Sequence, residues 1–334
     1  MTSYEQSTEV VSPPPLDPEC ATILANIPPF PTLTLETLQA ARQPPAGYEP
    51  PSDAVLSQNG AFTIEECTIP GGAGADISVV ICTPAQSAPP RPALYLVHGG
   101  GMFSGTARQS MPAYMHLAEA LGLVIVAVEY RLAPETPYPG PVEDCAAGLA
   151  WTFENAEKLG IDGNRVIVLG QSAGGGLAAS LILLARDHGH RMPLGLMLTA
   201  PMLDDRNNTV SAWQMEGIDT WGRSRNEVGW TALLGSQRGT PGVPPYAAPA
   251  RATDLSGLPP TFLDVGSAET FRDEVVEFAS KIWKSGGQAE LHVWPGGFHG
   301  YELLAPAASI SRDTRTAREA WLRRVLAGGS STKA

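Results

Sequence analysis

Continuous apolar runs recur along the chain from residue 93 onward, and longer stretches with a helical pattern separate them. The runs are Ala93–Val97, Leu123–Val128, Val166–Leu169, Leu194–Leu198, Thr261–Val265 and Leu291–Trp294. The helical stretches are residues 110–121, 142–159, 174–188, 270–285 and 313–326. A strand that is apolar at every position is buried on both faces, as in a parallel sheet covered by helices. The pattern therefore predicts an α/β fold built on a parallel sheet.

The chain before these runs has a different pattern. Phe62–Ile69 and Ile77–Thr83 are rich in apolar and β-branched residues, and the glycine-rich segment Gly71–Gly74 lies between them. This arrangement is typical of two strands joined as a hairpin. Residues 1–60 are rich in proline, and we interpret them as an N-terminal arm and part of a cap. Only short helices are expected there, over Pro18–Ala25 and Leu33–Arg42.

Residues 203–257 interrupt the alternation of apolar runs and helices. The segment holds three tryptophans, a run rich in proline and glycine over Gly239–Pro249, and a helical pattern near Arg225–Leu234. We interpret it as a cap insertion, a candidate lid over the carboxyl edge of the sheet. An ordinary crossover helix flanked by long loops is the alternative.

Composition and charge exclude several classes of function. Of the 334 residues 43% are hydrophobic, enough for the core of one large domain with an insertion. The formal net charge is −12 and Lys and Arg do not cluster, which argues against nucleic acid as a partner. The longest apolar runs, such as Leu121–Val128, are too short to span a membrane. The first residues lack the pattern of a signal peptide, so a cytoplasmic location is expected.

The cysteines show no spacing that indicates a metal or redox site. No CxxC pair occurs in the chain, and we expect reduced and mostly buried thiols. The four cysteines are Cys20, Cys67, Cys82 and Cys145.

The segment around Ser172 carries the strongest chemical signal. The apolar run Val166–Leu169 leads into a Gly-x-Ser-x-Gly motif over residues 170–174, and a helix of small residues follows. A nucleophilic serine has to stand clear of the sheet on a sharp, strained turn between strand and helix. Glycines flank it because a Cβ there would collide with the neighbouring strand or helix. The turn also places the N–H of Ala173 at a helix N-terminus, aimed at developing negative charge. We predict that Ser172 is the nucleophile.

A second signal is the segment His98–Gly101, directly after the run Ala93–Val97. Glycines let the backbone approach a substrate carbonyl closely, and their N–H groups can donate to an oxyanion. A phosphate-binding loop would need GxxxxGK[ST], and no Lys follows here. A plain glycine-rich turn is the other alternative. We predict an oxyanion loop, in which His98 organises the backbone by hydrogen bonding.

Position along the chain selects the base and the acid. Where such an elbow carries a catalytic triad, the residues follow in the order Ser, acid, His. His292 lies within the run Leu291–Trp294, whereas His299 follows it in a loop, from which a ring can reach the serine. We therefore predict that His299 is the base. Glu269 lies just beyond Thr261–Val265 and is the expected acid, which orients the imidazole. The other carboxylates near it are Asp264, within the strand, and Asp273 and Glu274, in the next helix; Asp273 is the second choice.

Together these residues resemble the hormone-sensitive-lipase-like family of α/β-hydrolases. The resemblance runs from about residue 90 to residue 305. The family's HGGG loop matches His98–Gly101, and its GxSAGG elbow matches Gly170–Gly175. Its YRLAPE segment matches Tyr130–Glu135, with Asp144 further on. Its HGF segment matches His299–Tyr301, and the stretch after its acid matches Phe271–Glu274. Tyr301 replaces the usual Phe, and Gln171 stands where Asp or Thr is usual. Glu269 stands where most members have Asp, although a subset uses Glu.

The resemblance implies an α/β-hydrolase fold with an eight-stranded, mostly parallel sheet, flanking helices and a helical cap. Residues 61–334 would form the α/β-hydrolase catalytic domain, with the cap insertion near 203–257. It implies a serine carboxylesterase that hydrolyses short- to medium-chain esters without a metal or other cofactor, as a monomer or homodimer. The implied oxyanion donors are the N–H groups of Gly100, Gly101 and Ala173. Three consecutive glycines also resemble the arrangement linked to esters of bulky, even tertiary, alcohols.

Several interpretations of the pocket and of the function fit the sequence. Met102, Phe103 and Trp213 are candidates for the wall of a substrate pocket, with core packing as the alternative. A hydrolase dedicated to one metabolite ester or lactone would use the same site. A non-catalytic small-molecule receptor on this fold is a further possibility, but the plant receptors of the family lose the histidine, and His299 is present here.

Overall fold

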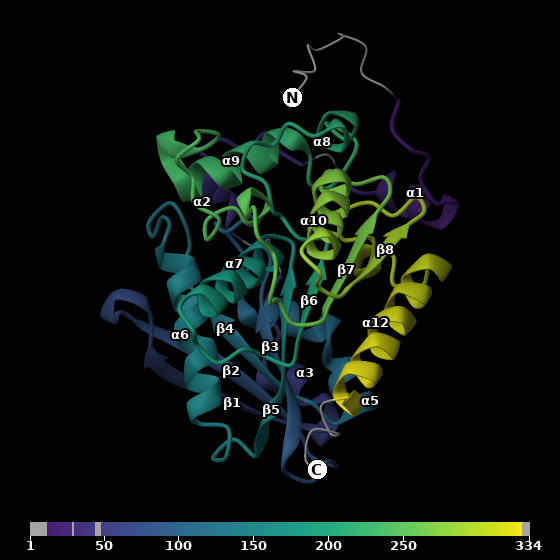
Figure 1. Ribbon diagram of the computed structural model, residues 1–334. Coiled ribbons are helices and arrows are strands. Elements are labelled where there is room, and N and C mark those ends of the chain that lie inside the picture. Colours follow the sequence, from purple (N-terminus) through teal and green to yellow (C-terminus); the bar gives the residue numbers. More distant parts are fainter. Residues whose placement is uncertain (1–11, 29, 44–47, 329–334) are drawn as a thin grey trace.

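The computed structural model describes residues 12–28, 30–43 and 48–328. In this part of the chain one eight-stranded sheet has helices on both faces (Figure 1). The strands are β1 (Phe62–Pro70), β2 (Asp76–Pro84), β3 (Arg91–Val97), β4 (Val124–Glu129), β5 (Ile161–Gln171), β6 (Gly195–Thr199), β7 (Thr261–Gly266) and β8 (Ala289–Trp294). Their order is β1-β2-β4-β3-β5-β6-β7-β8, and the β1–β2 and β2–β4 pairs are antiparallel. The other pairs are parallel, so the predicted mostly parallel sheet is confirmed.

The apolar runs are explained by two cores, one on each face of the sheet. Tyr95 and Val97 of β3 belong to one core, and Leu94 and Leu96 belong to the other. Successive side chains of a strand point to opposite faces, so a strand between two cores is apolar at every position.

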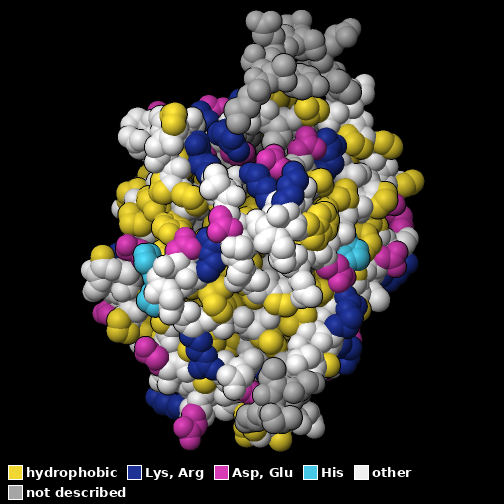
Figure 2. All heavy atoms as spheres, in the orientation of Figure 1, with side chains coloured by type: hydrophobic (Ala, Val, Ile, Leu, Met, Phe, Trp, Pro, Cys, Tyr) yellow, Lys and Arg dark blue, Asp and Glu magenta, His cyan; other side chains and the backbone are white. Residues whose placement is uncertain are grey.

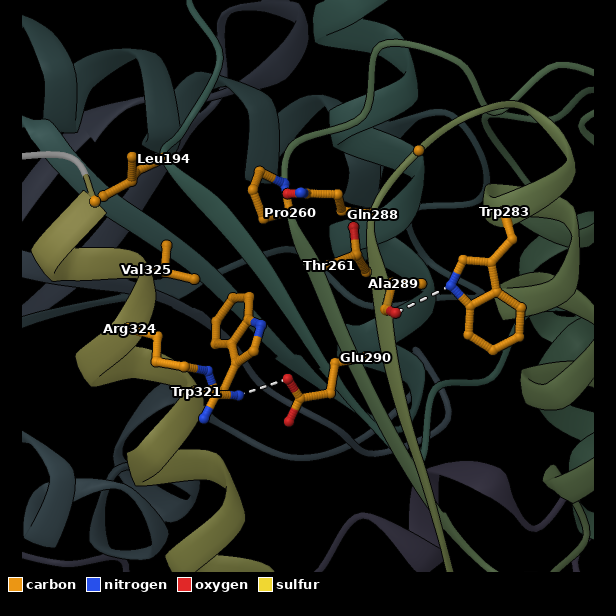
Figure 3. Close-up of a pocket in the computed structure, with 12 residues that line it drawn as sticks. Leu194, Pro260, Thr261, Trp283, Gln288, Ala289, Glu290, Trp321, Arg324 and Val325 are labelled. Carbon is orange, nitrogen blue, oxygen red and sulfur yellow. Dashed lines mark hydrogen bonds and ion pairs between the residues drawn. The ribbon is translucent and has the colours of Figure 1, made fainter. Parts of the chain in front are cut away.

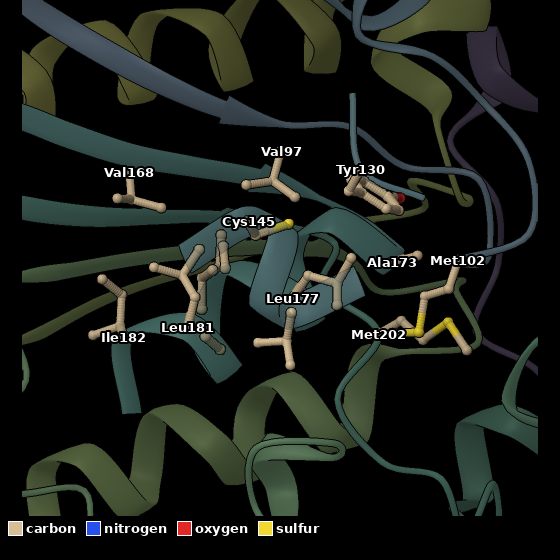
Figure 4. Packing of buried hydrophobic residues seen from close by; sticks show 14 of the residues in the cluster. Val97, Met102, Tyr130, Cys145, Val168, Ala173, Leu177, Leu181, Ile182 and Met202 are labelled. Atoms are coloured by element: carbon tan, nitrogen blue, oxygen red, sulfur yellow. The ribbon is translucent and has the colours of Figure 1, made fainter. Parts of the chain in front are cut away.

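Helices from the middle and the C-terminal part of the chain close both cores. The α-helices are α1 (Pro18–Leu24), α2 (Leu38–Ala41), α3 (Asp53–Leu56), α4 (Ala107–Ser110), α5 (Met115–Leu121), α6 (Gly140–Glu154), α7 (Ala173–Asp187), α8 (Val210–Gln214), α9 (Arg223–Leu234), α10 (Arg272–Lys284), α11 (Tyr301–Leu304) and α12 (Ser309–Gly328). Short 3-10 turns lie at Gln58–Gly60, Gly72–Gly74, Met111–Ala113, Gly235–Gln237 and Pro249–Arg251. Helices α6, α7 and α10 pack in the Tyr95 core, and α5 and α12 in the Leu94 core. Figure 4 shows Leu177 and Leu181 of α7 with Val97 and Val168 of the sheet.

Four expected elements differ from the structure. The helices expected over 142–159 and Leu33–Arg42 are shorter, at Gly140–Glu154 and Leu38–Ala41. The stretch 110–121 is not one helix but the end of α4, a 3-10 turn and α5. Pro112 lies at the break, and proline inside a helix removes a hydrogen bond and collides with the preceding turn. Strand β5 begins at Ile161, before the apolar run at Val166, because Ile161 already pairs with Arg91 of β3.

The segments interpreted as arm and cap gather where the parallel strands end. Helices α8 and α9 lie beyond the arrowheads of the central strands (Figure 1). In the arm, Cys20 of α1 packs against Phe298 and Tyr301, and Arg42 forms an ion pair with Glu135. Residues 1–11, 29 and 44–47 of the predicted arm lie outside the described residues.

Charged side chains of both signs share the surface, and the thiols are unpaired. On the face in Figure 2, basic side chains are interspersed with acidic and hydrophobic ones. Within the described ranges, no helix combines the length and the apolar character that crossing a membrane requires. The four cysteines are unpaired, and burial raises the pKa of Cys20 and of Cys82 to about 12.

Candidate active site

Ser172 stands at the turn between β5 and α7 with backbone angles φ 53° and ψ −122°. A positive φ is strained for a residue with a Cβ, so the surrounding structure has to enforce it. Two hydrogen bonds do so: Ser172 N–H donates to Thr199 O at 2.9 Å, and Met202 N–H donates to Ser172 O at 2.9 Å. The elbow predicted from the motif is therefore held by the strand end and the loop next to it.

The glycines of the elbow are required by close backbone contacts. A Cβ on Gly170 would lie 2.2 Å from Gly174 O, and one on Gly174 would lie 2.2 Å from Val97 O. Both distances are far inside van der Waals contact. The helix after the serine can therefore press against β3 and β5 only if both positions lack a side chain.

The glycine loop after β3 lies beside the elbow. A Cβ on Gly99 would be 3.3 Å from Ser172 Cβ, and one on Gly100, where φ is 119°, would be 2.0 Å from Ser104 O. Among the described residues, no hydrogen bond uses the N–H of Gly100 or Gly101. Ala173 is the first residue of α7, where the N–H has no partner within the helix. Among the described residues, the N–H groups of Gly100 and Gly101 thus have no partner, and that of Ala173 has none within its helix.

His299 and Glu269 meet although they come from different loops. Glu269 follows β7 and His299 follows β8, and His299 Nδ1 lies 2.7 Å from Glu269 Oε1. The other oxygen of Glu269 accepts the N–H of Gly266 at 3.0 Å. Burial lowers the pKa of His299, but the carboxylates of Glu269, Asp219 and Glu302 outweigh it, so the pKa is raised overall.

The competing acids and the other histidine have different partners. Asp264 forms a buried ion pair with Arg318, Asp273 accepts the N–H of Ser211, and Glu274 accepts the N–H of Leu203. His292 lies within β8, where its Nε2 is 3.0 Å from Glu290. Of these carboxylates, only Glu269 is hydrogen-bonded to His299. Within the described ranges, no three His, Cys, Asp or Glu side chains gather as a metal site would require.

Comparison with known proteins places the chain in a family. A family model described as the alpha/beta hydrolase fold matches residues 94–303. The chain belongs to this family. It is 33% identical over 269 residues to the carboxylesterase NlhH of Mycobacterium tuberculosis, covering 74% of the chain and 78% of that protein. A solved bacterial heroin esterase shares 40% identity at a TM-score of 0.84, over 93% of the chain and 98% of that structure.

The relationship to hormone-sensitive lipase is also found. Human hormone-sensitive lipase is 36% identical over 118 residues, which are 35% of the chain and 11% of that protein. The family predicted from the glycine loop and the elbow is therefore confirmed.

In this α/β-hydrolase, the YRLAPE segment lies behind the glycine loop. The Tyr130 hydroxyl donates to His98 O at 2.9 Å, and the two rings stack with centroids 4.1 Å apart. His98 Nδ1 lies 2.8 Å from Gly99 O, and burial lowers the pKa of His98 to about 4. The ring is therefore neutral at pH 7 and positions the loop. Arg131 forms an ion pair with the buried Asp144, which also accepts the N–H of Gly72.

The candidate pocket residues of the α/β-hydrolase have different surroundings. Met102 and Phe103 are fully buried next to the glycine loop, whereas Trp213 is 41% exposed and stacks on Arg223. Trp221, also in the insertion at 203–257, has the contacts expected of a residue in the wall of a substrate pocket. A Cβ on Gly101 would lie 2.4 Å from its ring, and the ring centroid is 6.3 Å from that of His299. The sequence placed several tryptophans in this segment but held no signal to choose between them.

A hollow of about 750 Å³ lies far from these residues (Figure 3). It opens between α12 and the amino ends of β7 and β8, and Thr261, Ala289, Trp321 and Arg324 line it. In parallel α/β sheets, functional residues follow the carboxyl ends of the strands, as Ser172 does here. The hollow therefore lies at the opposite end of the strands from the candidate site.

Proposed function

We propose that this α/β-hydrolase is a serine carboxylesterase in which Ser172, His299 and Glu269 form the triad. The observation that carries the proposal is the 2.7 Å contact between His299 Nδ1 and Glu269 Oε1, in a chain whose serine sits in a strained elbow. Relatives over most of the chain, named carboxylesterase and heroin esterase, support ester hydrolysis.

The reaction proceeds through an acyl-enzyme. His299 Nε2 takes the Ser172 proton as Oγ attacks the ester carbonyl, and Glu269 stabilises the imidazolium. The N–H groups of Gly100, Gly101 and Ala173 bind the tetrahedral oxyanion. His299 then protonates the leaving alcohol. Water activated by the same ring releases the acid and restores the serine.

The substrate class of this proposal is short- to medium-chain esters. Met102 and Phe103 follow the oxyanion loop directly, and Trp221 covers Gly101, so these side chains limit the space beside the carbonyl. The arm and the insertion at 203–257 would form the cap, because residues of both, Phe30 and Thr220 among them, line a hollow of about 410 Å³.

The test is hydrolysis of p-nitrophenyl butyrate by the wild type and by Ser172→Ala. The variant should lose roughly 1000-fold or more of kcat while it remains folded. Ser180→Ala is the matched control, because Ser180 is buried in α7, the helix that follows Ser172, and its hydroxyl has no partner among the described residues. Fluorophosphonate should label the wild type and not Ser172→Ala. Near-normal turnover by Ser172→Ala would refute the assignment.

A further inference from the structure

Asp219 connects the insertion to both loops that carry the proposed base and acid. Its Oδ1 accepts the N–H of His299 at 2.8 Å, and its Oδ2 accepts the N–H of Thr270 at 3.1 Å. Thr270 directly follows Glu269 in the chain. One side chain of the insertion thus bridges the loop after β7 and the loop after β8.

Neighbouring residues strengthen the same connection. Thr220 Oγ1 donates to His299 O at 2.6 Å, and Thr270 Oγ1 donates to Trp221 O at 2.6 Å. Residues 219–221 therefore make four hydrogen bonds to the two loops. Because Trp221 also covers Gly101, a shift of this segment would move the base and the pocket wall together.

A negative charge on Asp219 is unfavourable, because the carboxylate is largely removed from water. Burial and the nearby Glu269 raise the pKa of Asp219 to about 6, although His299 acts in the opposite direction. A neutral amide in its place would offer only one oxygen to the two N–H donors. The charged groups around this carboxylate are His299 and Glu269 from the loops, and Glu216 and Arg225 around the adjoining hollow. An anion beside an imidazole stabilises the imidazolium that forms during attack.

We propose that Asp219 is a positioning residue of the catalytic site: it aligns the His299 and Thr270 main chains and places a second negative charge beside the imidazole. The proposal rests on the function proposed above, because it assigns Asp219 to the same triad. It gives the insertion a direct part in catalysis, in addition to covering the site.

The test compares Asp219→Asn with Asp162→Asn. Asp162 also accepts a neighbouring backbone N–H, that of Asn164, but it lies at the opposite end of β5 from the elbow. Asp219→Asn should lower kcat about tenfold or more with KM little changed, and Asp162→Asn should lower neither. The acidic limb of kcat/KM should move to lower pH in Asp219→Asn, because a negative charge that favours the imidazolium is lost. A purely structural link would lower the rate at every pH and leave the limb in place.

A measurement independent of turnover separates this proposal from the esterase proposal. NMR titration of histidine-labelled protein, with His299→Ala to assign the signal, should give a lower pKa for His299 in Asp219→Asn than in the wild type. An unchanged pKa would overturn the electrostatic role, whether or not the wild type hydrolyses esters.

A second variant covers the case in which Asp219→Asn does not fold. Thr220→Val removes one of the four hydrogen bonds and keeps the carboxylate, so it should lower kcat without moving the acidic limb. Wild-type kcat in Thr220→Val would overturn the positioning role. Hydrolysis by the wild type and its loss in Ser172→Ala test the esterase function separately.

Discussion

Glu269 Oε1 lies 2.7 Å from His299 Nδ1, and the second oxygen of the same carboxylate accepts the Gly266 N–H at 3.0 Å. The Glu269 carboxylate is therefore fixed at both oxygens, one to the ring and one to the end of its own strand. A carboxylate on Nδ1 keeps the proton there and leaves Nε2 as the base. The longer side chain of Glu, compared with the usual Asp, reaches the ring from a loop that is itself pinned to β7.

The first prediction concerns the charge and length of this acid. Glu269→Gln should lower kcat by about 100- to 10,000-fold, because an amide neither holds the productive tautomer nor stabilises the imidazolium. Glu269→Asp keeps the charge on a side chain shorter by one carbon and should lose less. Initial rates with p-nitrophenyl butyrate give both values.

Asp273→Asn is the matched control for this prediction. Asp273 accepts the N–H of Ser211 at 2.8 Å and pairs with Arg272, so its loss should lower stability and leave kcat near the wild type. If Asp273→Asn were as inactive as Glu269→Gln, the acid would have been assigned to the wrong residue.

The local parts of the site could be predicted from the sequence. The elbow at Ser172 and the loop at His98–Gly101 are continuous segments of the chain. Their glycines stand where a side chain would collide with the backbone: a Cβ on Gly174, for example, would lie 2.2 Å from Val97 O. Glu269 is predicted as the acid because it lies just past the end of a strand, which is also a local property of the sequence. In the same way, strands buried on both faces were recognised from their uninterrupted apolar runs.

Contacts across the insertion could not be predicted in the same way. Asp219 and Trp221 lie about 50 residues from Thr270 and further from His299, and no periodicity connects them. Trp213, the pocket candidate in the sequence, lies exposed at the surface with Arg223 over its ring. The fold of a loop over a site depends on tertiary packing, and a composition of tryptophan, proline and glycine does not encode which ring points inward.

The second prediction addresses the pocket wall. Trp221→Ala should raise kcat/KM for bulky esters relative to acetate, because the ring that lies against Gly101 and Phe103 is removed. A panel of p-nitrophenyl esters of increasing size measures the ratio. Trp213→Ala is the control and should leave the ratio unchanged. A change in Trp213→Ala alone would instead support Trp213 as the pocket residue.

The third prediction tests the ion pairs beneath the base loop. Arg318 of α12 pairs with Asp264 at 2.7 Å and with Glu302 at 3.2 Å, and all three side chains are buried. Arg318→Met should lower the free energy of unfolding by about 3–5 kcal/mol, because two buried carboxylates lose their partner. Urea denaturation measures the change.

Arg323→Met provides a control on the same helix. Arg323 is 56% exposed and pairs with Glu319 one turn away, so its loss should cost only about 0.5 kcal/mol. Equal losses in the two variants would show that burial does not determine the contribution of these pairs.

The fourth prediction is a pH dependence of stability that comes from Glu129. Burial raises the pKa of this carboxyl to about 7 from its ordinary value of 4.5, although the Ala107 N–H donates to it at 2.8 Å. Below pH 4.5 Glu129 is protonated in both the folded and the unfolded chain, and no penalty exists. As the pH rises towards 7, Glu129 ionises in the unfolded chain before it does in the folded one, so the free energy of unfolding falls.

Glu129→Gln remains neutral and removes this penalty. Its free energy of unfolding relative to the wild type, from urea denaturation at each pH, should therefore rise between pH 5 and pH 8. The rise should be on the order of 1–2 kcal/mol, because the Glu129 side chain is about a third exposed. Glu65→Gln, at an exposed position of β1, should show a constant difference over the same range. A constant difference in Glu129→Gln as well would mean that Glu129 is ionised in the folded chain as readily as in water.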